Sequence, residues 1–213
     1  MRNLKNSYDK PSLIFEEKFF RKGYRRIAGI DEAGRGPIAG PVVAASVILD
    51  QNNIPKGIND SKKLSPASRE IIFHQIMLTA IVGIGIGDVE KIDSINILNA
   101  TKYAMNLSVE RLDDKPDLLL IDGNFTINNN TQNIPIISGD TKSLSIAAAS
   151  IIAKVTRDNL MNKFSHIFTK YKFAKNNGYP TKDHLNIVNN FGICSLHRKS
   201  FKPINKIINK NNL

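Results

Sequence analysis

Apolar residues along the chain alternate between short continuous runs and repeats at helical spacing. Runs rich in β-branched or aliphatic residues, bounded by glycine or polar turns, are typical of strands. The run DLLLID is continuous, which is typical of a strand buried on both faces. These runs predict strands at 26–31, 41–49, 81–89, 117–122 and 134–137.

Apolar positions three and four residues apart predict helices between and after these strands. Ser65 followed by Pro66 has the form of a helix N-cap and first helical position, and Asp93 is a second candidate cap. We expect the basic end of the chain to be a loose tail. The predicted helices span 12–22, 66–80, 93–112, 143–164 and 181–191.

The order of these elements predicts an α/β or α+β domain, because strands cluster early, helices cluster late and the connections are mixed. We expect a mixed sheet flanked by helices, with a small C-terminal lobe from about residue 171. The segment before Gly23 and the Asn-rich loop at 128–133 are expected to be peripheral.

Length and composition narrow the class of protein. With 213 residues, 41% of them apolar, the chain suits one domain with a buried core and is not typical of a disordered protein. It has no run approaching about 18 apolar residues and no signal-peptide pattern, so we expect neither a transmembrane helix nor secretion. The single cysteine, Cys194, is expected to be a packing residue and fits a reducing cytoplasm.

The net charge of +11 favours a polyanionic partner, because neutralising phosphates releases counterions. A generally basic proteome would give the same balance. The distribution is more informative, since no acidic residue lies in 184–213 and a second basic cluster occupies 21–26. The cations of the C-terminal stretch are Arg198, Lys199, Lys202, Lys206 and Lys210.

Carboxylates follow three of the predicted strands. Asp31 and Glu32 end the first, Asp122 ends the run LLLID, and Asp140 lies between a short strand and a long helix. Two like charges 4 Å apart repel by about 4 kcal/mol at an effective dielectric near 20, so converging carboxylates need cations. Oxygen ligands select Mg²⁺ or Mn²⁺, and a pair of such ions suits displacement at phosphorus.

Simpler interpretations of these acids stay open. An aspartate at a strand end is often only a turn residue, and one before a helix is often only an N-cap, which applies to Asp140. The adjacent pair Asp31 and Glu32 is harder to explain in this way, because burying both without partners is costly.

Three loops carry groups suited to a phosphate or a sugar, and each also has an ordinary structural explanation: a tight turn for GRGP, a solvated charged turn for DSKKLS and a packing tyrosine for GYPT. The turn GRGP at 34–37 exposes backbone amides beside an arginine, and DSKKLS at 60–65 precedes a helix N-terminus. The turn GYPT at 178–181 holds a tyrosine that can stack on a sugar or base. The GIGIG repeat at 83–87 has the wrong spacing for a dinucleotide site, and the four histidines lack zinc spacing with one another or with Cys194.

Seven segments, in order, resemble the ribonuclease HII family of type 2 ribonucleases H. The first carries the acidic pair and the GRG turn in the form typical of HII rather than HIII. The segments are IAGIDEAGRGPIAGPVVAASVIL (27–49), INDSKKLS (58–65), EKIDSINILNA (90–100), LLIDGN (119–124), GDTKSLSIAAASIIAKVTRD (139–158), NNGYPTKDH (176–184) and HRKSF (197–201).

The resemblance implies an RNase H-like fold: a mixed five-stranded sheet flanked by helices, with a small C-terminal helical segment. It divides the chain into an N-terminal extension (1–24), a catalytic domain (25–170) and a C-terminal helical segment with a basic tail (171–213). It also implies that four carboxylates are catalytic and hold two divalent ions, Mn²⁺ or Mg²⁺. These carboxylates are Asp31, Glu32, Asp122 and Asp140.

The resemblance further implies that the GRG turn contacts the 2′-hydroxyl of a ribonucleotide and that the tyrosine of GYPT packs against its sugar. Two other segments are implied in contacts to the nucleic-acid backbone. The residues implied in substrate binding are Gly34, Arg35, Gly36, Lys62, Ser143 and Tyr179.

The implied activity is hydrolysis of the RNA strand of RNA/DNA hybrids and nicking 5′ of ribonucleotides embedded in DNA, giving 5′-phosphate and 3′-hydroxyl ends. A role in ribonucleotide repair follows by analogy, and we expect a monomer without membrane contact. Two alternatives stay open. A DNA junction nuclease would cut branched DNA, and a non-catalytic RNA-binding protein would show no metal-dependent chemistry.

Overall fold

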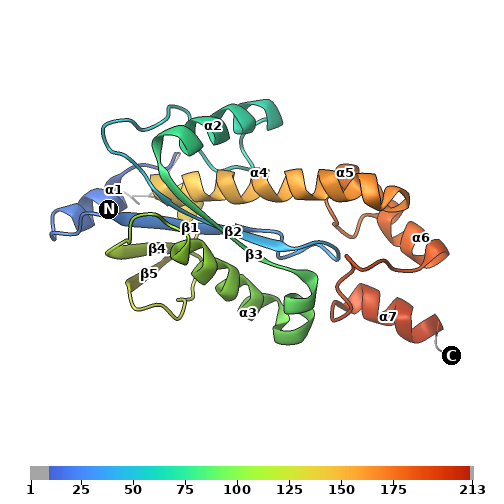
Figure 1. Cartoon of the computed structure of the whole chain (residues 1–213). Coiled ribbons are helices and arrows are strands. Elements are labelled where there is room, and N and C mark those ends of the chain that lie inside the picture. Colours follow the sequence, from blue (N-terminus) through green and yellow to red (C-terminus); the bar gives the residue numbers. More distant parts are fainter. Residues whose placement is uncertain (1–9, 212–213) are drawn as a thin grey trace, which may run out of the picture.

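Five strands form one mixed sheet in the order β3-β2-β1-β4-β5 in the computed structural model of the chain, which describes residues 10–211 (Figure 1). β1 pairs antiparallel with β2 and β2 with β3, whereas β1–β4 and β4–β5 are parallel. The predicted fold class, a mixed five-stranded sheet with flanking helices, is confirmed. The strands are β1 (Ile27–Ala33), β2 (Val42–Ile48), β3 (Ile81–Gly87), β4 (Leu118–Asp122) and β5 (Gln132–Ile136).

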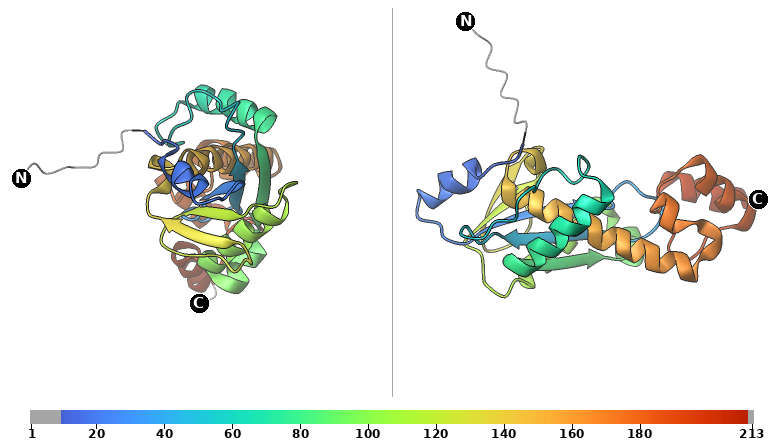
Figure 2. Two further views of the ribbon diagram at one scale, coloured as in Figure 1. Left: turned by 90° about the vertical axis from the view of Figure 1, so that its left-hand side faces the viewer. Right: turned by 90° about the horizontal axis from the view of Figure 1, so that it is seen from above.

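Helices cover both faces of the sheet. α3 (Val89–Glu110) packs on one face, and α4 (Leu144–Ile167) with α2 (Pro66–Thr79) packs on the other (Figures 1 and 2). Central strands buried on both faces explain the continuous apolar runs. The close approach of α3 to β3 requires small residues on the strand, because a Cβ on Gly85 would lie 1.9 Å from a backbone oxygen of α3. The glycines of the GIGIG repeat therefore allow α3 to pack closely against β3.

Two predicted element bounds are wrong in ways that affect the site. β1 continues to Ala33, so Asp31 and Glu32 lie within the strand and not at its end. α3 begins at Val89 under an Asp88 N-cap and is kinked at Asn96, which has φ 66°. Asp93 is therefore not the cap; its carboxylate accepts the backbone amides of 199 and 200.

The C-terminal lobe has its own apolar core beyond the end of the sheet (Figure 2). The basic stretch predicted as a loose tail forms the helix α7 (Lys202–Asn211), because its apolar positions face this core and Ile204 is fully buried. Ile38 and Ala39 of the β1–β2 connection share the same core. The other elements of the lobe are η2 (Thr169–Tyr171), α5 (Phe173–Asn176) and α6 (Lys182–Phe191).

The N-terminal segment is not peripheral where it is described. In α1 (Ile14–Phe20), Phe19 packs against the sheet. The buried Glu16 carboxylate accepts bonds from the Ser143 hydroxyl and from the amide and hydroxyl of Ser145. Residues 1–9 of the predicted extension lie outside the described residues, as do residues 212–213 of the tail. None of the described helices is long and apolar enough to cross a membrane.

Candidate active site

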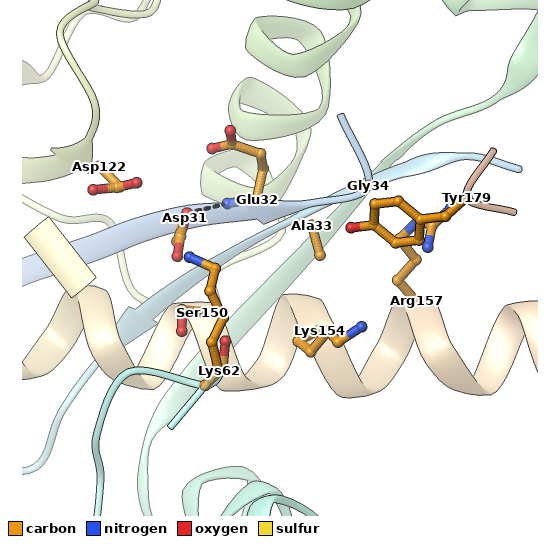
Figure 3. A pocket seen from close by; sticks show the side chains of 11 residues that line it. Asp31, Glu32, Ala33, Gly34, Lys62, Asp122, Ser150, Lys154, Arg157 and Tyr179 are labelled. Atoms are coloured by element: carbon orange, nitrogen blue, oxygen red, sulfur yellow. Dashed lines mark hydrogen bonds between the residues drawn. The ribbon is translucent and has the colours of Figure 1, made fainter. Parts of the chain in front are cut away.

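A pocket of about 290 Å³ opens where β1, the end of β4, α4 and the C-terminal lobe meet (Figure 3). Three of the four predicted catalytic carboxylates line it, together with cations and a tyrosine. Its lining consists of Asp31, Glu32, Ala33, Gly34, Ser61, Lys62, Asp122, Ser150, Lys154, Arg157 and Tyr179.

Asp31 is the most strongly perturbed acid of the pocket. It is buried in β1, and its Oδ1 accepts the Glu32 amide at 2.6 Å. Burial raises the pKa of Asp31 well above its ordinary value, and the neighbouring charges of Glu32, Asp122 and Asp140 raise it further. A carboxylate in this state is poorly compensated when ionised.

Glu32 points to the other side of the strand, because successive residues of a strand alternate between its faces (Figure 3). Burial raises the pKa of Glu32, and the Arg35 guanidinium, which donates to Oε1 at 3.1 Å, opposes that rise. The second oxygen, Oε2, is buried without a hydrogen-bond partner among the described residues. An orphaned carboxylate oxygen beside a pocket is a site suited to a cation.

Asp122 and Asp140 meet at the end of β4. Asp122 Oδ1 accepts the amide of Gly139 at 2.6 Å, and Asp140 follows in the short 3₁₀ turn η1 (Gly139–Thr141). Burial raises the pKa of Asp122; the Gly139 hydrogen bond opposes this rise and Asp140 adds to it. Asp140 does not appear in the pocket lining, but it accepts a bond from Lys62 Nζ at 3.3 Å.

The N-cap explanation for Asp140 is wrong. The cap of α4 is Ser143, whose hydroxyl accepts the Ile146 amide. The Ser143 hydroxyl also donates to Glu16, and its side chain is fully buried. In this structure Ser143 therefore lies under α1 and away from the pocket, contrary to the expectation that it meets substrate.

The four carboxylates fit a divalent cation chemically: they offer oxygen ligands, Asp31 and Asp140 are buried, and the pKa values of Asp31, Glu32 and Asp122 are raised. The site is not preassembled. Across residues 10–211, no group of three or more His, Cys, Asp or Glu side chains converges closely enough to hold an ion. Glu32 is paired with Arg35, and Asp140 is paired with Lys62.

Two buried arginines fix the turn that carries Gly34, Arg35 and Gly36. Arg198 uses all five of its N–H groups, donating from Nε to Gly40 O, from Nη1 to Arg35 O and Pro37 O, and from Nη2 to Gly34 O and Gly40 O. Burial lowers the pKa of Arg198 to about 9, which keeps it charged at neutral pH.

Arg157 on α4 holds the rest of the same connection, donating to the carbonyls of Ala39, Pro41 and Asn177. A Cβ on Gly34, which has φ +99°, would lie 2.1 Å from the Arg157 side chain. The turn therefore requires glycine here both for its backbone conformation and for the arginine behind it.

Three of the six predicted substrate-binding residues line the pocket, namely Gly34, Lys62 and Tyr179. Tyr179 is 44% exposed, and a Cβ on Gly36 would lie 3.7 Å from its ring, so this turn and the tyrosine face each other. Arg35 stands at the edge of the pocket, with its guanidinium between Glu32 and the Phe125 ring.

Sequence reasoning missed the face that α4 presents to the pocket. Ser150, Lys154 and Arg157 line it at helical spacing, four and then three residues apart. This spacing is visible in the sequence, and polar residues interrupting an Ala-rich helix were the available signal. Arg198 carried no such signal, since a buried arginine looks like any surface cation.

Comparison with solved structures defines the class of protein as RNase H-like. Ribonuclease H2 from Pyrococcus horikoshii OT3 superimposes with a TM-score of 0.72 at 27% identity, over 88% of this chain and 99% of that one. Bst-RNase HIII in complex with Mn²⁺ has the same fold, with a TM-score of 0.65 at 20% identity over 87% of this chain and 70% of that one.

Sequence comparison narrows the class to one family. The family profile described as Ribonuclease HII matches residues 28–204. Ribonuclease HII of Listeria innocua serovar 6a is 51% identical over 191 residues, which span 89% of this chain and 73% of that protein. The chain belongs to the ribonuclease HII family, as its motifs predict.

Proposed function

We propose that this chain is a metal-dependent endoribonuclease that hydrolyses RNA paired to DNA and cuts 5′ of ribonucleotides embedded in duplex DNA. Membership of the ribonuclease HII family supports the activity. The observation that carries the site is a pocket that combines three carboxylates of raised pKa, buried Asp31 and half-buried Glu32 and Asp122, with Gly34 of the GRG turn. We propose 5′-phosphate and 3′-hydroxyl products.

We propose Asp31, Glu32, Asp122 and Asp140 as the catalytic carboxylates and as ligands of two ions, Mg²⁺ or Mn²⁺. Divalent ions supply a water of lowered pKa and offset charge at the leaving oxygen. Asp31 and Asp122, poorly compensated in this structure, are the residues that gain most from a cation. Arg35 and Lys62 release Glu32 and Asp140 when these acids become ligands.

Discrimination of RNA from DNA is proposed for the GRG turn. Arg198 draws the carbonyls of Gly34 and Arg35 to one side, so the amides of the turn are free to meet a 2′-hydroxyl on the other. Tyr179 packs against the sugar held there. Lys62 and Lys154, which line the same pocket, bind the phosphates of the substrate strand.

The division into an N-terminal extension (1–24), a catalytic domain (25–170) and a C-terminal segment (171–213) stays a proposal. It separates Tyr179 from the carboxylates, so both larger parts contribute to the pocket. A protein lacking 171–213 is therefore expected to lose cutting at single ribonucleotides.

The test uses a labelled DNA duplex with one ribonucleotide, incubated with Mg²⁺, Mn²⁺ or EDTA. The proposal predicts a single nick 5′ of the ribonucleotide, dependent on metal, and no cutting of the all-DNA duplex or of a four-way DNA junction. Cutting of the junction would favour a DNA-structure nuclease, and metal-independent binding without cutting would favour a non-catalytic RNA-binding protein.

A further inference from the structure

A buried chain of hydrogen bonds runs behind Tyr179, through two histidines. His184 Nδ1 lies 2.9 Å from the Tyr179 carbonyl oxygen, and His184 Nε2 lies 3.1 Å from His197 Nε2. His197 Nδ1 lies 3.0 Å from the backbone amide of Cys194. His184 is fully buried and His197 nearly so, so both rings depend on protein partners for their hydrogen bonds.

The groups at the two ends of this hydrogen-bond chain determine which ring nitrogen of each histidine carries a proton. The Cys194 amide can only donate, so His197 Nδ1 accepts and the His197 proton is on Nε2. That proton is donated to His184 Nε2, which leaves the His184 proton on Nδ1. There it is donated to the Tyr179 carbonyl, which can only accept. All three bonds are satisfied only when both histidines are neutral.

The hydrogen-bond chain ends at the turn that carries Tyr179. The Tyr179 carbonyl also accepts a hydrogen bond from the Thr181 amide at 2.8 Å. The Tyr179 amide donates to the Asn176 carbonyl. The Gly178 carbonyl accepts the amides of Ile38 and Ala39, which tie this turn to the connection carrying the GRG residues. A change in the peptide after Tyr179 therefore moves the ring relative to Gly36.

We propose that His184 and His197 are positioning residues: as a neutral, directionally hydrogen-bonded pair they fix the Tyr179 peptide, and so hold its ring over the pocket beside the GRG turn. The proposal rests on the proposed function of Tyr179 in holding the ribonucleotide sugar. Neither histidine lines the pocket, so both act through the tyrosine.

The groups around the pair keep it neutral. The Phe173 ring packs against both histidines and the Tyr171 ring packs against His197, and no carboxylate bonds to either histidine among the described residues. The nearest charge on α6, Asp183, is turned to Lys172. On the side of α3, a shallow cavity that reaches His197 is lined by Glu90, Asp93 and Lys199, and Cys194 Sγ lies 3.3 Å from His197 Nδ1.

Burial lowers the pKa of His184, and burial together with the neighbouring His184 lowers the pKa of His197 to about 4. Both shifts favour the neutral form of the rings, which is the form that the three hydrogen bonds require. The cluster of His184, His197 and Cys194 is no zinc site in this structure, because the facing nitrogens are already bonded to each other.

The first test reads the protons directly. In ¹⁵N-labelled full-length protein at neutral pH, imidazole nitrogen shifts should show His184 protonated on Nδ1 and His197 protonated on Nε2. Opposite tautomers, or a doubly protonated ring at pH 7, would overturn the proposal whether or not the protein cuts RNA.

The second test is a double-mutant cycle on cutting of the single-ribonucleotide duplex. H184L removes the donor to Tyr179, and one lost buried hydrogen bond is worth up to about tenfold in kcat/KM. H184N keeps a donor near the position of Nδ1 and should recover most of the loss. In a Y179A background, H184L should change kcat/KM by less than about twofold, because the group through which it acts is gone.

An equal loss from H184L with Tyr179 present or replaced would contradict the proposal and leave His184 a structural residue. H197L, which removes the donor toward His184, provides a second entry to the cycle if H184L does not fold, and its loss should likewise disappear in the Y179A background. The parent protein in the same assay reports on the proposed function itself: if it does not cut, the function fails, whereas failure of the cycle alone removes only the positioning role.

Discussion

The acidic pocket lies beside two buried arginines, Arg157 and Arg198, and the two regions differ in how their charges are compensated. Asp31 is buried and Glu32 is half-buried, both have raised pKa values, and one Glu32 oxygen has no partner in the described part of the chain. Arg198 is fully buried, yet each of its N–H groups donates to a carbonyl. The charges of the pocket carboxylates are therefore poorly compensated, whereas the charge of Arg198 is fully compensated by hydrogen bonds.

The difference indicates where the protein gives up stability for function. Groups that are uncompensated in the folded state destabilise it, and such groups concentrate where a ligand is to be bound. The arginines and histidines behind the pocket, by contrast, hold the loops on which the site depends. Substitutions in the two regions should therefore change stability in opposite directions.

The largest expected effect is the loss of nuclease activity caused by the D31N substitution. Removing one carboxylate from the proposed metal site should cost several kcal/mol in the transition state, or about 1,000-fold or more in kcat. The folded protein should become more stable at neutral pH, because a buried charge with a raised pKa is replaced by a neutral amide. Cleavage kinetics and urea unfolding measure the two changes.

The matched control is D113N, which removes an exposed carboxylate from the loop after α3. It should leave both activity and unfolding within error of the parent protein. If D31N lowered stability, Asp31 would have stabilising partners in the fold and the contrast between the two regions would fail.

R198A should produce the opposite stability change. Removing the guanidinium leaves the carbonyls of Gly34, Pro37 and Gly40 without their donor, at a cost of about 3 kcal/mol or more. The exposed neighbour Lys199 provides the control, since K199A keeps the backbone amide that bonds Asp93. Equal unfolding midpoints for the two variants would show that Arg198 does not support the turn.

The pH dependence of stability separates the regions by sign. His197 has a folded pKa of about 4, below its unfolded value, so its contribution is complete above about pH 6.5 and is lost as the pH falls toward 4. The maximum loss is about 3 kcal/mol. The pocket acids act in the opposite direction, because protonation as the pH falls removes the cost of their desolvated charge and also relieves their repulsion.

Urea unfolding between pH 7 and pH 4.5 measures this balance. The decline in stability should be steeper in D31N, which lacks one relieving acid, and shallower in H197Q, which lacks the histidine. Identical slopes in the three proteins would mean that neither region governs the acid response.

Glu16 gives the smallest effect and the sharpest contrast within one residue type. It is a buried carboxylate whose Oε1 accepts three hydrogen bonds, so E16A should destabilise the protein by about 2 kcal/mol, whereas D31N stabilises it. The neighbouring E17A removes only an exposed pair with Arg21 and should cost less than about 1 kcal/mol. Equal losses from E16A and E17A would show that the N-terminal helix is not anchored by Glu16.

The strands and the acids that follow them were predictable from sequence, because both depend on local patterns. A continuous run such as DLLLID identifies a central strand, and its final aspartate then lies at the edge of the sheet. The motif segments added the family and the GRG turn. The helix α7 was not predicted, because its apolar stripe has meaning only against the core formed by Ile38 and Phe173.

The side-chain partnerships of the site were beyond the sequence for a different reason. Ser143 belongs to a family segment but lies under Glu16, 127 positions away. Arg198 bonds the GRG turn across more than 150 residues, and no local pattern marks such a pair. These partnerships could not be predicted because the partners lie far apart in the sequence, and not because their chemistry is unusual.

The central claim is that the pocket acids form a divalent-metal site whose uncompensated charge the ion relieves. Anomalous diffraction from crystals soaked in Mn²⁺ tests it most directly. We predict manganese peaks in contact with Asp31 and Asp122, with Glu32 turned away from Arg35, and loss of these peaks in D122N. Saturating Mn²⁺ with no anomalous density between Asp31 and Asp122 would contradict the account.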